Sequence, residues 1–105
     1  MGISERQFDL IQEAAKLLME DIRLTLEEAI NLITTCIKIE LVKRNVTMET
    51  LNASSLSDRT AFTRAIVHNV QQKIIENPNW RAKNLAASIE KFYKVLHKSW
   101  IQNSI

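Results

Sequence analysis

The chain has 105 residues, of which 46% are hydrophobic and 25% are charged, and its formal net charge at pH 7 is +2. This length suits one domain, and these fractions suit a folded core rather than a disordered chain. The single glycine, single proline and single cysteine exclude a glycine-rich phosphate loop, a paired-cysteine metal site and an internal disulfide. We therefore expect one all-α domain over residues 1–105.

The first helix is predicted to begin at Ser4, because Gln7 lies three residues further on and completes the pattern of a capping box. We expect this helix to end near Leu24. Apolar residues recur along it at steps of three and four, which is typical of a helix that packs against a partner helix: they are Phe8, Ile11, Ala15, Leu18 and Ile22. The same apolar seam also allows a homodimer.

The second helix is predicted to begin after Thr25, which forms another capping box with Glu28. Apolar residues cover most of its circumference between residues 26 and 41, and a helix of this kind usually lies at the centre of a bundle. We expect it to end near Asn45. Two cations precede this residue and favour the last carbonyls of a helix, and asparagine tolerates the left-handed conformation.

Residues 46–56 show the least regular pattern. Thr47 is expected to cap a short helical turn that carries Met48 and Leu51, and Leu56 is expected to plug the core. The third long helix is then predicted to have Ser57 as its N-cap. Its apolar stripe follows the helical period: Phe62, Ile66, Val70 and Ile74.

Pro78 disfavours helical geometry at Asn77, so the third long helix is predicted to end there. Asn77 or Asn79 is expected to cap the last helix. The predicted core face of that helix is Leu85, Ile89, Phe92, Leu96 and Trp100. Short connections at 23–25 and 77–79 make consecutive helices antiparallel neighbours. The sequence thus predicts a four-helix antiparallel bundle with a short extra helical turn between the second and third long helices.

The residues that most often carry catalysis are isolated in this sequence. Neither His68 nor His97 has a second metal ligand three or four residues further along its helix. Cys36 lies in an apolar run, which disfavours a reactive thiolate. We therefore expect no catalytic site, no metal and no cofactor, and hence a protein that is not an enzyme.

Residues 47–66 partly match a helix-turn-helix, in which a short helix precedes a recognition helix that contacts DNA. The polar residues at the start of the second helix would then contact bases and phosphates: Arg59, Thr60, Thr63 and Arg64. The usual turn glycine is absent, and the spacing from Leu51 to Ser57 is one residue too short. An ordinary transition from loop to helix is the preferred interpretation, with DNA binding as the alternative.

The last helix offers a second candidate surface. Trp80, Tyr93 and Trp100 are aromatic residues of the type that anchors protein partners or stacks on bases. The alternative is that Tyr93 and one tryptophan pack in the core while the other tryptophan lies at its edge. Three cations lie on the side opposite the predicted core face: Lys91, Lys94 and Lys98. The net charge of residues 57–105 is +5, against −3 for residues 1–56. This asymmetry indicates either a basic face for an anionic partner or ordinary surface solvation.

The polar start MGISERQFDL lacks the pattern of a secretory signal, and no apolar stretch reaches the roughly 18 residues needed to span a bilayer. A lone cysteine fits a reducing compartment, so we expect a cytoplasmic protein with no membrane partner. In size and helical organisation the chain is loosely similar to bacteriocin immunity proteins and to small phage or plasmid regulators, although no motif carries that similarity. The leading hypothesis is a non-enzymatic interaction or regulatory protein that binds a protein partner.

Overall fold

The computed structural model of the chain describes residues 4–80 and 84–101, with side chains as far as Lys98. It contains five helices in this part of the chain: α1 (Glu5–Asp21), α2 (Leu26–Arg44), α3 (Met48–Asn52), α4 (Leu56–Glu76) and α5 (Leu85–Ile101). No strand occurs among these residues. The predicted all-α class is therefore confirmed.

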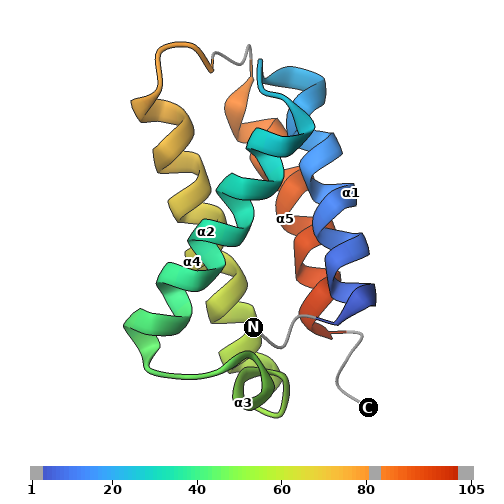
Figure 1. Cartoon of the computed structure of the whole chain (residues 1–105), viewed down its shortest axis with the longest axis vertical. Helices are drawn as coiled ribbons and strands as arrows, with labels where there is room; N and C mark the ends of the chain where they lie inside the picture. The colour runs from blue at the N-terminus through green and yellow to red at the C-terminus, as the bar shows by residue number, and fades with distance from the viewer. Residues whose placement is uncertain (1–3, 81–83, 102–105) are drawn as a thin grey trace.

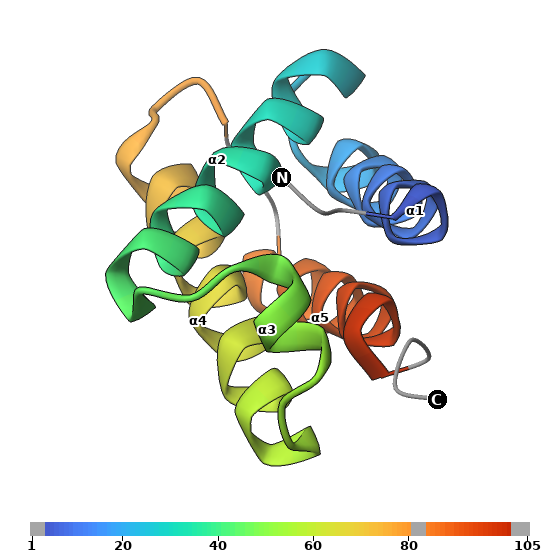
Figure 2. The ribbon, with the colours of Figure 1, turned by 60° about the horizontal axis from the view of Figure 1, so that its bottom comes forward.

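The four long helices run alternately up and down the long axis of the molecule (Figure 1). Each packs mainly against two neighbours: α1 lies between α2 and α5, and α4 lies between the same two helices on the other side. The short α3 packs against α4 at one end of the bundle (Figure 2). This arrangement confirms the predicted antiparallel bundle with a short helix between its second and third long helices.

Both predicted capping boxes are present. The backbone N–H of Gln7 donates to Ser4 Oγ at 3.1 Å, and Gln7 Oε1 accepts from the Ser4 N–H at the same distance. At the start of α2, the Glu28 N–H donates to Thr25 Oγ1 at 3.1 Å, and the Glu28 carboxylate accepts from the Thr25 N–H at 2.9 Å. These bonds satisfy backbone donors that have no partner within the helix.

The end of α2 also follows the prediction. Asn45 adopts φ 55° and ψ 45°, in the left-handed region. This conformation turns the chain so that the Val46 N–H reaches the Leu41 carbonyl at 3.1 Å.

The predicted start of α4 is wrong by two residues. Ser55 is the N-cap in place of Ser57, and its Oγ accepts from the Asp58 N–H at 3.1 Å. With Ser55 as the cap, Leu56 becomes the first residue of the helix and lies 52% exposed, so it does not plug the core. Met48 of α3, which is 1% exposed, is buried at this end of the bundle instead.

The predicted start of the last helix is also wrong. Pro78 ends α4 at Glu76 as expected, but Asn77 caps only a local turn, in which its Oδ1 accepts from the Asn79 N–H at 3.0 Å. The cap of α5 is Asn84, whose Oδ1 accepts from the Ala87 N–H at 3.2 Å. The connection is therefore longer than the predicted residues 77–79.

The apolar seam of α1 is used inside the molecule. Ile11, Ala15 and Leu18 are fully buried and Ile22 is 2% exposed, so only Phe8 of this seam keeps substantial exposure. A homodimer through the α1 seam would require the bundle to open. The rest of the core comes from the predicted stripes, including Phe62 of α4 and Phe92 of α5.

The expectation that α2 is the central helix is wrong. In a ring of four helices α2 forms one wall, and two of its apolar side chains face outward: Ile39 is 48% exposed and Val42 is 80% exposed. No helix among the described residues is both long and apolar enough to cross a membrane.

Candidate binding surface

Two of the four residues proposed to contact DNA lie inside the bundle. Arg59 is 6% exposed, and its Nη1 donates to the backbone carbonyl of Asn52 at 3.2 Å. Thr63 is fully buried, and its hydroxyl donates to the Arg59 carbonyl at 3.0 Å. Neither side chain offers its polar atoms to a partner while the bundle is folded.

The other two residues lie at the contact between α4 and α5. Thr60 is half-buried, and its Oγ1 is 3.0 Å from Nε2 of His97. Arg64 is exposed, and its guanidinium carbon lies 4.3 Å from the centre of the Tyr93 ring, within cation–π range. Tyr93 in turn stacks on His97, with ring centres 5.2 Å apart and planes inclined by 20°. These four side chains thus form one continuous set of contacts along the α4–α5 seam.

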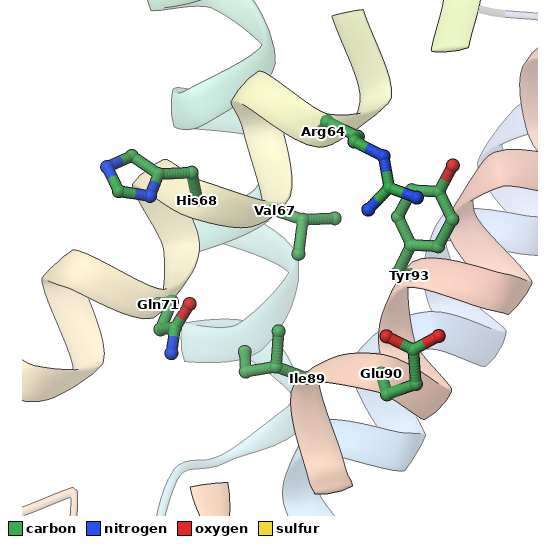
Figure 3. A pocket seen from close by; sticks show the side chains of 7 residues that line it. All are labelled: Arg64, Val67, His68, Gln71, Ile89, Glu90 and Tyr93. Carbon is green, nitrogen blue, oxygen red and sulfur yellow. The ribbon is translucent and has the colours of Figure 1, made fainter. Parts of the chain in front are cut away.

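A shallow pocket of about 210 Å³ lies beside this set of contacts, between α4 and α5 (Figure 3). Val67 and Ile89 point toward each other across the seam, and both are largely buried. Polar and aromatic side chains complete the lining: Arg64, His68, Gln71, Glu90 and Tyr93. The pocket therefore combines an apolar floor with one cation and one carboxylate at its rim.

The three lysines of the predicted partner surface are all exposed on α5. Lys94 lies one helical turn after Glu90, so it stands on the side of α5 next to the pocket. Lys91 and Lys98 lie further round the same exposed side of the helix. We name the set of Arg64, Lys91, Lys94 and Lys98 the α4–α5 basic face. None of these four cations forms an ion pair within the described part of the chain. Arg44, by contrast, pairs with Glu40 on α2.

The aromatic residues of the predicted surface differ in placement. Tyr93 is 9% exposed, with its ring covered by Arg64 and His97, so it supports the surface from below. Trp80 is half-buried and packs against the edge of the core. The side chain of Trp100 lies outside the described residues.

The environments of two titratable groups are distinctive. Burial, and secondly the positive charge of Arg64, lowers the pKa of His97 below its ordinary value of 6.5. These effects favour the neutral form of His97, which lies between its stacking partner Tyr93 and its hydrogen-bond partner Thr60. Burial raises the pKa of the Cys36 thiol, an effect that the nearby Lys73 partly offsets, and Cys36 is only 1% exposed. Among the described residues no three His, Cys, Asp or Glu side chains are grouped as a metal site requires.

Five residues of the pocket lining were not predicted as site residues from the sequence: Val67, His68, Gln71, Ile89 and Glu90. A signal for these residues existed in the helical period. His68 follows Arg64 by one turn, and Glu90 precedes Tyr93 by three residues, so each shares a side of its helix with a residue that was singled out. The helical period does not show which two helices face each other, so it did not predict that these residues share one pocket.

No family model, curated protein or solved structure matches this chain.

Proposed function

We propose that this is a non-enzymatic interaction or regulatory protein that binds an acidic surface of a protein partner through the α4–α5 basic face. The observation that carries the proposal is that four exposed cations, Arg64 with Lys91, Lys94 and Lys98, outnumber the one exposed carboxylate at the pocket, Glu90, and form no ion pair within the described chain. Exposed charges of one sign attract a partner of the opposite sign and speed its diffusional encounter.

The pocket beside these cations adds an apolar contact to the charge of the surface. Exposed ion pairs contribute only about 0.2–1 kcal/mol each, so four of them need an apolar contact beside them to hold a partner. Val67 and Ile89 are 7% and 8% exposed and offer a small apolar contact on the floor of the pocket, beside which the Tyr93 ring contacts Arg64. We therefore expect the partner to carry acidic residues around one small apolar side chain.

Binding of DNA remains the alternative, but with fewer of the predicted contact residues. Since Arg59 and Thr63 are buried, a helix-turn-helix contact through residues 47–66 retains only the exposed Arg64 and the half-buried Thr60. Any contact with phosphates would use the same α4–α5 basic face, so one experiment separates the two partner classes.

The test compares the native chain with the triple variant Lys91→Glu, Lys94→Glu, Lys98→Glu. A matched control changes three exposed cations elsewhere by the same charge: Lys16→Glu, Arg23→Glu and Lys73→Glu. The probes are fluorescent poly-L-glutamate and a fluorescent DNA duplex of random sequence, followed by anisotropy over a series of salt concentrations. In parallel, nuclease-treated lysate is passed over each immobilised protein and the captured proteins are identified by mass spectrometry.

We expect the native chain to bind poly-L-glutamate with an affinity that falls as salt rises. The triple variant should lose at least about tenfold, which corresponds to 1.4 kcal/mol, while the control should lose less. At least one protein captured from the lysate by the native chain and by the control should be absent from the capture by the Lys91, Lys94 and Lys98 triple variant. Binding of the duplex alone would favour the DNA alternative. Equal binding by the two triple variants would refute the assignment of this face.

A further inference from the structure

A second unpartnered surface lies on α2, away from the α4–α5 seam. Glu28, Leu32, Thr35, Ile39 and Val42 follow one another at steps of four, three, four and three residues, the repeat of a helix–helix seam. We name these five residues the α2 seam. In the bundle four of them are exposed, and Leu32 is half-buried, with part of its side chain packed against the edge of the core. In Figure 1 α2 faces the viewer and no described helix lies in front of it, and Figure 2 shows the same helix at the outside of the bundle.

The charges beside this seam identify its occupant. The N-terminal end of α2 carries two exposed carboxylates, Glu27 and Glu28, and its C-terminal half carries Lys38, Lys43 and Arg44. Of these, Arg44 already pairs with Glu40 at 2.7 Å, which leaves the two lysines for other partners. A second α2 laid antiparallel brings the acidic end of each helix against the basic end of the other. A parallel copy would bring like charges together at both ends.

We propose that α2 is the interface of a homodimer, in which two copies pack antiparallel about a two-fold axis at Thr35. In this register Leu32 of one copy packs on Ile39 of the other, and Glu28 of one copy faces Val42 of the other, one residue from Lys43. Thr35 is small enough to let the two helices approach at the axis. A register centred on Ile39 would also join apolar residues, but it places the two copies of Lys38 side by side. Charge therefore selects the axis at Thr35.

A single pair of helices makes a small interface, at the low end of the range for specific contacts, below about 1,200 Å². We accordingly expect a weak dimer that forms reversibly as protein concentration rises. The α2 seam contains none of the four cations of the α4–α5 basic face. The two proposals are therefore independent: the protein can be a monomer that binds a partner through the α4–α5 basic face, or a dimer that does not.

The register is tested by disulfide trapping in a Cys36→Ala background, which removes the native thiol. Thr35→Cys should cross-link to itself under mild oxidation, because the two thiols meet at the axis. Ile39→Cys should not, because its two copies lie eight residues apart along the helices, about 12 Å, beyond the span of a disulfide. A mixture of Leu32→Cys with Ile39→Cys should form the mixed dimer. Lys16→Cys on α1 serves as the control for random collision.

The second measurement needs no cysteine variant. Sedimentation equilibrium of the native chain should show a mass that rises from monomer toward dimer with concentration. Val42→Glu should abolish the rise, because it places a carboxylate against Glu28 of the other copy, and Lys43→Glu should weaken association where Lys16→Glu does not. A native chain that stays monomeric at millimolar concentration would overturn the proposal. So would self-linking of Ile39→Cys, or trapping of Thr35→Cys no faster than that of Lys16→Cys.

Discussion

Arg59 lies in the core as a cation with almost no compensation, and we expect Arg59→Met to stabilise the protein. The side chain is 6% exposed, its Nη1 makes one hydrogen bond of 3.2 Å to the Asn52 carbonyl, and its Nε has no hydrogen-bond partner. A buried charge costs several kcal/mol in lost hydration, and an unsatisfied buried donor costs about 1–3 kcal/mol. The single charge-assisted bond returns about 1.5–3 kcal/mol. Methionine fills a similar volume without these costs, so the free energy of unfolding should rise by about 1 kcal/mol.

The measurement is urea unfolding at neutral pH, followed by far-UV circular dichroism, with thermal unfolding as a check. A gain of 1 kcal/mol raises the Tm of a domain of this size by about 4 °C. Arg23→Met, at an exposed position, is the control and should change stability by no more than about 0.5 kcal/mol. A loss of more than about 1 kcal/mol in Arg59→Met would refute this reasoning, because it would mean that the buried guanidinium stabilises the fold.

Two further predictions concern local features. The pKa of His97 lies below its ordinary value of 6.5, so the unfolded chain binds more protons than the folded chain and stability should fall as pH drops below about 6.5. His97→Gln should flatten this part of the pH profile in urea titrations, and an unchanged slope would contradict the assignment. Asn45 has φ 55°, so Asn45→Ala should lower the unfolding free energy by about 1 kcal/mol. Asn45→Gly should preserve or slightly raise it, and equal unfolding midpoints for these two variants would count against backbone strain as the cause.

The parts of the fold that sequence predicts well are those decided within a few residues. Ser4 with Gln7 and Thr25 with Glu28 bond within their own helical turn, so the capping boxes are legible without knowledge of the rest of the chain. Asn45 ends α2 for the same local reason. These features placed both ends of α2 and the start of α1 correctly.

Where two neighbouring residues can play one role, the sequence alone does not choose. Ser55 and Ser57 are both able to cap α4, and the structure shows that the Ser55 hydroxyl takes this role by accepting from the Asp58 N–H. The same holds for the asparagines before α5. Asn84 caps α5 in place of Asn77 or Asn79, although Pro78 would be favourable in the first turn of a helix capped by Asn77.

The candidate DNA-binding residues show how a motif can mislead when the helical period is not followed through. The buried stripe of α4 at Ile66, Val70 and Ile74 extends backward at steps of three and four to Thr63 and Arg59. Those two residues therefore stand on the core side of their own helix, and the period could have excluded them as base contacts. The exposure of Arg64 and the three lysines follows from the same period, and this part of the candidate surface was readable from sequence.

The apolar circumference of α2 was the feature whose interpretation changed most. A helix that is apolar on nearly every side usually lies at the centre of a bundle, but a ring of four helices has no central position. The outward side of α2 therefore stays in water in the monomer, with Val42 80% exposed and Ile39 48% exposed. Full burial of a valine or isoleucine side chain is worth about 1.5–3 kcal/mol, which the monomer forgoes at these positions. A second copy laid across α2 recovers part of it, so the same residues that suggested a central helix are explained by an interface.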